Sequence, residues 1–100
     1  MKIKNASNTA TDKCPNCGDW IDHWQRFSEQ KLPPVCPVYG CTETKLEGAH
    51  IELVGYVQEN QVGYIFIVPL CHTHNMTKDE LDTEDIALVH ADLKMTCGNH

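Results

Sequence analysis

The chain has no long hydrophobic run and no cluster of lysine and arginine residues. A membrane-spanning helix takes about 20 consecutive apolar residues, so the sequence predicts no contact with the membrane interior. The missing basic cluster argues against nucleic-acid binding. So does the formal net charge of −6, which comes from 14 acidic and 8 basic residues. We therefore expect a protein partner rather than a nucleic acid.

The first residues also lack the apolar core of a secretory signal peptide, since residues 1–8 are MKIKNASN. Thiols that are not exported stay reduced, so we expect a cytoplasmic location. The even count of six cysteines permits three disulfides, but the spacings favour metal ligands. A chain of 100 residues has a small core, which a bound metal would stabilise.

The polar residues 1–12 predict a flexible N-terminal arm, followed by a single zinc-stabilised domain over residues 13–100. The segment CPNC at residues 14–17 is typical of a zinc knuckle. A short helix is expected after it and before Pro33-Pro34, because apolar residues recur there at helical spacing. These residues are Trp20, Ile21, Trp24 and Phe27.

A second, wider knuckle is predicted at residues 36–41, where Pro37 and Gly40 suit a reversal of the chain. A β-hairpin is expected next, with strands over residues 49–57 and 62–68 and a polar turn at 59–61. The class predicted by these elements is a small α+β domain.

Two helices are predicted in the C-terminal quarter of the chain. The sequence TKDE at residues 77–80 is a capping box, which indicates a helix start. Residues 86–93 fit a helix and also fit a strand, and we favour the helix.

Four residues form the first candidate metal site, and their types and spacing point to zinc. Thiolate and imidazole are the ligands that zinc prefers in tetrahedral sites. The predicted order is a knuckle, a hairpin and a helix start with the second ligand pair, an order that resembles the treble-clef zinc finger. The ligands are Cys36, Cys41, Cys71 and His74. A zinc ribbon is the alternative grouping, with Cys14, Cys17, Cys36 and Cys41 as ligands.

A second zinc site is expected if the first uses the treble-clef grouping, because the N-terminal cysteine pair then needs partners. The pair is Cys14 and Cys17, and the C-terminal Cys97 supplies a third thiolate. Either His23 or His100 would complete the set. The expected cofactor is therefore one or two Zn²⁺ ions.

Two segments together resemble the HNH endonuclease family, which folds as a ββα-metal variant of the treble clef. They are GAHI at residues 48–51 and CHTHNMTK at residues 71–78. The resemblance covers residues 36–78 and rests on few positions. The chain is also similar to short bacterial zinc-finger proteins.

The resemblance implies three catalytic positions. His50 matches the general base that activates water, and Asn75 takes the place of a metal-binding histidine. Asn60 would be the middle residue of the motif. Active members carry an aspartate before the base and use it to hold a divalent ion such as Mg²⁺, but here that position is Ala49. A carboxylate would have to come from Glu47 or Glu52.

The function expected from the sequence is a zinc-binding, HNH-like treble-clef module for macromolecular recognition, without catalysis. The alternative is a divalent-metal-dependent DNA endonuclease with His50 as its general base. In that case the partner is DNA, and the ion is Mg²⁺ or another divalent cation.

Overall fold

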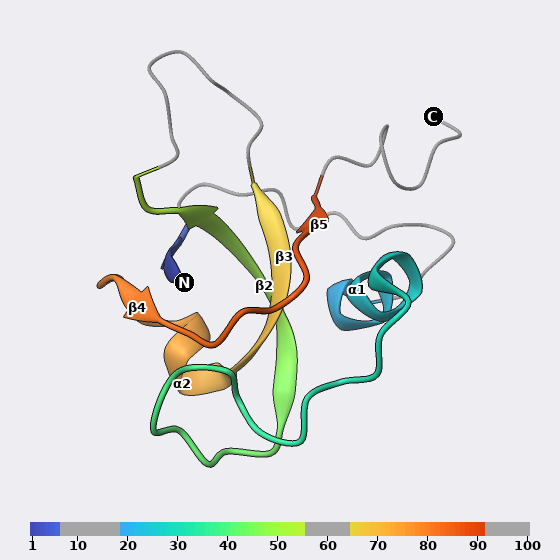
Figure 1. Ribbon diagram of the computed structural model, residues 1–100, viewed down its shortest axis with the longest axis horizontal. Coiled ribbons are helices and arrows are strands. Elements are labelled where there is room, and N and C mark those ends of the chain that lie inside the picture. The colour runs from blue at the N-terminus through green and yellow to red at the C-terminus, as the bar shows by residue number, and fades with distance from the viewer. Residues whose placement is uncertain (7–18, 56–64, 92–100) are drawn as a thin grey trace.

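A computed structural model describes residues 1–6, 19–55 and 65–91 of the chain. It is an α+β fold with one five-stranded antiparallel sheet and two helices (Figure 1). The strand order is β4-β1-β2-β3-β5. The strands are β1 (Lys2–Asn5), β2 (Leu46–Leu53), β3 (Phe66–Cys71), β4 (Leu81–Asp82) and β5 (Val89–His90). The helices are α1 (Trp20–Ser28) and α2 (His72–Asn75).

Strands β2 and β3 form the centre of the sheet and the predicted hairpin. Their register pairs Leu46 with Cys71 at one end and Ile51 with Phe66 at the other. Both strands extend further toward the metal ligands than the predicted ranges 49–57 and 62–68. Strand β2 begins at Leu46, and β3 continues to Cys71. The predicted turn at 59–61 lies outside the described residues.

Side chains alternate between the two faces of a strand, so the sheet has a core cluster on each face. On one face, Ile67 of β3 and Val89 of β5 are buried against Trp24 of α1. On the other face, a larger cluster contains two of the candidate metal ligands. Its buried members are Ile3, Cys36, Ala49, Ile51, Val68, Leu70, Cys71 and Leu81.

Helix α1 confirms the prediction from apolar spacing, and it packs closely on β2. It begins after Asp19, whose backbone N–H donates to Asp22 Oδ2 at 3.3 Å. It ends at Ser28, because Glu29 adopts a left-handed conformation with φ of 58°. Beneath the helix lies Gly48, where a Cβ atom would be only 2.6 Å from the backbone of Trp20. The absence of a side chain at this position allows the helix to approach the sheet.

The predicted flexible arm is wrong for residues 2–5, which form β1 inside the sheet. This strand pairs with β2 on one side and with β4 on the other. Ile3 is fully buried, and its burial offsets the entropy lost when a short polar segment becomes ordered. Residues 7–12 lie outside the described part of the chain.

The helix predicted from the capping box at residues 77–80 is also wrong. The helical turn α2 precedes this segment, and the strand β4 follows it. The hydroxyl of Thr77 donates to the carbonyl of Thr73 at 2.9 Å, so it closes the end of α2 rather than starting a new helix. Leu81 pairs with Ile3 and joins the core, a tertiary contact that overrides the local signal.

The favoured helix at residues 86–93 is wrong as well, because the described part of this segment contains β5. Val89 is buried against Ile67 of β3, with which it pairs, and against Trp24.

Among the described residues, no helix has the length and hydrophobicity needed to cross a bilayer.

Candidate metal centre

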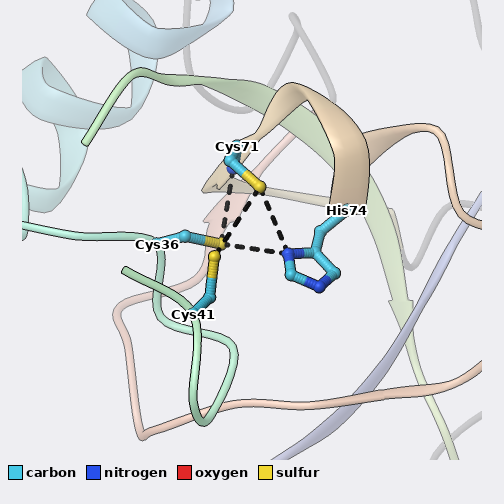
Figure 2. A group of neighbouring side chains, drawn as sticks. All are labelled: Cys36, Cys41, Cys71 and His74. Atoms are coloured by element: carbon cyan, nitrogen blue, oxygen red, sulfur yellow. Dashed lines mark hydrogen bonds between the residues drawn. The ribbon is translucent and has the colours of Figure 1, made fainter. Parts of the chain in front are cut away.

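Four side chains converge where the end of β3 meets the loop between α1 and β2 (Figure 2). Cys36 and Cys41 belong to that loop. Cys71 is the last residue of β3, and His74 lies in α2. One ligand atom from each residue lies within 4.8 Å of all the others.

Three distances within this cluster are close to those around a tetrahedral zinc ion. With Zn–S bonds of about 2.3 Å, neighbouring sulfur atoms in a tetrahedron lie about 3.8 Å apart. The Sγ atoms of Cys41 and Cys71 are 3.9 Å apart. His74 Nδ1 lies 3.2 Å from Cys71 Sγ and 3.7 Å from Cys36 Sγ. The cluster is therefore consistent with one Zn²⁺ site.

Disulfide bonds do not link the cysteines of this cluster, because all three are free thiols. A disulfide requires sulfur atoms about 2.05 Å apart, and the 3.9 Å between Cys41 Sγ and Cys71 Sγ is far longer. For the described cysteines, the predicted metal chemistry thus fits better than the disulfide alternative.

The loop at residues 36–41 is shaped by backbone hydrogen bonds. The N–H of Cys36 donates to the carbonyl of Glu43 at 2.8 Å, and the N–H of Cys41 donates to that of Val38 at 3.0 Å. Gly40 supplies the positive φ, 83°, that this reversal needs. The knuckle predicted from Pro37 and Gly40 is thus a tight turn that directs two thiols toward β3.

The burial of Cys36 affects its protonation. Burial raises the pKa of the Cys36 thiol to about 11, although the backbone N–H of Cys71 donates to its sulfur at 3.4 Å and opposes the rise. A divalent cation reverses this balance, because it binds the thiolate and displaces the proton. Cys36 and Cys71 are buried, whereas Cys41 and His74 are half-buried.

The structure brings Cys36 and Cys41 together with Cys71 and His74, which is the first of the two groupings predicted from the sequence. The ribbon alternative and the second zinc site both need Cys14 and Cys17, which lie outside the described residues. Cys97 and His100 also lie outside them. His23 is described, and its Nε2 donates to the carbonyl of His90 at 3.1 Å. The second site therefore stays a prediction.

The residues of the nuclease motif do not converge in the same way. The ring of His50 packs against the ring of Trp20 in α1, with centroids 4.7 Å apart. Asn75 instead donates to Glu47 Oε1 at 2.6 Å. Glu47 and His50 are an odd number of residues apart on β2, so their side chains leave opposite faces of the strand. Asn60 lies outside the described residues.

The sequence named Glu47 as a possible carboxylate but did not predict its contacts with α2 beside the metal centre. Glu47 Oε1 lies 3.1 Å from His72 Nδ1 as well as 2.6 Å from Asn75 Nδ2. The two-residue alternation of β2 could have placed Glu47 on the same face as Ala49. The contact with α2 could not be predicted without knowing where β3 ends.

Two histidines where α1 packs on β2, His23 of the helix and His50 of the strand, are predicted to make the protein acid-sensitive. Burial lowers the pKa of His23, and Arg26 adds to the effect, although the bond to the His90 carbonyl opposes it. Burial also lowers the pKa of His50, with a contribution from His23. Their pKa values in the folded state are thus below the unfolded value of about 6.5, so the unfolded chain binds protons more readily. The free energy of unfolding should fall as the pH drops below about 6.5.

Urea unfolding at pH 7.5 and pH 5.5 measures this effect, and the variant His23→Gln separates it from proton competition at the metal ligands. Acid weakens zinc binding equally in both proteins, so the variant should lose less stability between the two pH values than the wild type. Equal losses would show that His23 contributes nothing to the pH dependence.

Comparisons of the chain with protein-family models, curated proteins and solved structures found no match.

Proposed function

We propose that the protein is a zinc-held, HNH-like treble-clef module that recognises another macromolecule without catalysing a reaction. The observation that carries the proposal is the convergence of four protein ligand atoms within 4.8 Å of one another. A zinc ion with four protein ligands has no open position for water or substrate, which is the arrangement of structural sites rather than catalytic ones.

The order of the elements supports the treble-clef assignment. A turn at residues 36–41 provides one ligand pair, β2 and β3 form the hairpin, and α2 follows β3 directly. The second pair lies where β3 passes into α2, as Cys71 and His74. Helix α2 is one turn long, so this is a treble clef reduced to the turn that carries its last ligand.

The positions of His50 and Asn75 favour recognition over nuclease activity. Metal-dependent hydrolysis needs a base and a cation that act on the same phosphate. His50 packs against α1 on one face of β2. Asn75 donates a hydrogen bond to Glu47, whose side chain lies on the other face of β2. Ala49, in place of the family's aspartate, is fully buried. The net charge of −6 favours a protein partner over DNA.

One contact favours the nuclease alternative. Glu47 lies beside Asn75 and could supply the carboxylate that Ala49 lacks. Mg²⁺ prefers such oxygen ligands, so a divalent ion at Glu47 and Asn75 is the arrangement a nuclease would use.

A plasmid nicking assay decides between the two functions. We expect the zinc-loaded protein to leave supercoiled plasmid intact with Mg²⁺, Mn²⁺ or Ni²⁺, and His50→Ala to behave in the same way. We also expect no binding to duplex DNA at low salt. Nicking that depends on the added metal and disappears in His50→Ala would establish the nuclease. Salt-dependent DNA binding without nicking would overturn the choice of a protein partner.

A further inference from the structure

The side chain of Asn5 connects the N-terminal strand to the helical turn that holds a metal ligand. Asn5 Nδ2 donates two hydrogen bonds, to the carbonyl of His74 and to the carbonyl of Thr77, each at 2.8 Å. These contacts join residues about seventy positions apart in the sequence. Both are partly buried, so water competes with them less than it would at the surface.

Helix α2 needs such an external support because it is a single turn. Isolated helical turns are unstable, since nucleation fixes several residues for few hydrogen bonds. The final carbonyls of a helix also lack partners within it. Asn5 donates to the carbonyl of His74, which also accepts from the N–H of Thr77 at 3.2 Å, and to the carbonyl of Thr77 three residues later.

The support is itself held firmly. Asn5 pairs with Ile51 of β2, and the N–H of the next residue, Ala6, donates to the carbonyl of His50 at 2.9 Å. Two residues earlier, Ile3 is fully buried between β2 and β4. The Asn5 amide therefore projects from the ordered sheet.

We propose that Asn5 is a positioning residue for the zinc ligand His74, so that docking of β1 and zinc binding strengthen each other. The proposal rests on the zinc-binding function proposed above. Mutation of a group that hydrogen-bonds to a metal-binding residue commonly changes the metal affinity. Asn5 makes such a bond to the backbone carbonyl of His74. The coupling must be reciprocal, because a contact that favours the zinc-bound arrangement is favoured by zinc in turn.

The test compares Asn5→Asp with the wild type, because aspartate has the same shape but cannot donate a hydrogen bond to either carbonyl. Competition with a chromophoric chelator gives the zinc dissociation constant, and Co²⁺ absorption at saturation reports the ligand geometry. We expect Asn5→Asp to weaken zinc binding by about 10-fold or more and to alter the saturated Co²⁺ spectrum.

Two control variants separate positioning from general loss of stability. Lys4→Ala removes an exposed neighbour on β1 and should leave both readouts unchanged. Val89→Ala destabilises the core beneath α1, on the other face of the sheet from the core cluster that contains Cys36 and Cys71. It should weaken zinc binding only through folding, and it should keep the wild-type Co²⁺ spectrum at saturation.

Wild-type affinity and spectrum in Asn5→Asp would overturn the positioning role while leaving the zinc site intact. A wild-type protein that binds no zinc would overturn the proposed function instead. If Asn5→Asp does not fold, Asn5→Ala takes its place, because it removes both donated hydrogen bonds without adding a charge. We expect a change in the same direction, and unchanged affinity and spectrum in Asn5→Ala would overturn the proposal.

Discussion

Removal of zinc with a chelator is expected to unfold the protein under reducing conditions. Structural zinc contributes on the order of 10 kcal/mol of binding free energy in small domains. That is comparable to the whole unfolding free energy of a typical domain, about 5–15 kcal/mol. The buried cluster on the metal side includes Cys36 and Cys71, so losing the ion leaves two thiols to be satisfied within the core. Far-ultraviolet circular dichroism and tryptophan fluorescence measure the loss, and added zinc should reverse it.

The variant Cys71→Ser tests the same effect without a chelator. Serine is close to cysteine in size, so the change removes a zinc ligand with little change in packing. We expect Cys71→Ser to lose its cooperative thermal transition. The matched control is His72→Ala, the next residue, whose side chain is 76% exposed and contacts Glu47 rather than the metal cluster. It should fold and bind zinc normally. A chelated protein that melts cooperatively at the wild-type temperature would contradict the structural role of zinc.

The second large effect is expected from Gly48→Ala. A Cβ atom at this position would lie 2.6 Å from the backbone carbon and the Cβ of Trp20, and 2.7 Å from the backbone nitrogen of Ile21. These atoms cannot rotate away, so α1 must move off β2. That movement loosens Trp24, which is 1% exposed, from Ile67. We expect the free energy of unfolding to fall by about 3 kcal/mol or more, because overpacking and the loss of core contacts act together.

The matched control is Gly55→Ala, at a glycine with nothing within 4 Å of the added atom. Its positive φ of 86° alone should cost about 1–2 kcal/mol. Urea denaturation followed by tryptophan fluorescence measures both variants. Equal losses would show that α1 does not depend on close contact at Gly48.

Local patterns were sufficient where one segment carries its own signal. The spacing of Trp20, Trp24 and Phe27 predicted α1, because helical periodicity is contained in nine residues. The types and spacing of the cysteine and histidine residues predicted two possible ligand groupings, because zinc sites combine ligand pairs a few residues apart. The structure brings together the favoured one, Cys36, Cys41, Cys71 and His74.

Local patterns failed where distant segments decide the structure. Lys2–Asn5 contains one apolar residue, and it is a strand only because β2 and β4 pair with it on both sides. Thr77 begins a capping box, but the burial of Leu81 places the following residues in β4. Tertiary pairing outweighs such propensities, which are worth a fraction of a kcal/mol per residue.

The surroundings of the metal site could not be predicted either, because they too depend on contacts between distant segments. The motif at residues 48–51 suggested His50 as a base, but the motif alone could not show that α1 covers this histidine. The bonds from Asn5 to His74 and Thr77 depend on β1, which the sequence did not predict. Residue types and their spacing along the chain identify candidate metal ligands. The contacts that hold those ligands in place depend on the assembled sheet.

Native mass spectrometry of the wild type and of His74→Ala tests the metal centre most directly. We predict that the wild type carries zinc and that His74→Ala carries one zinc ion fewer under the same conditions, whatever is bound elsewhere in the chain. A folded wild type without metal, or an equal number of zinc ions in both proteins, would contradict zinc binding by Cys36, Cys41, Cys71 and His74.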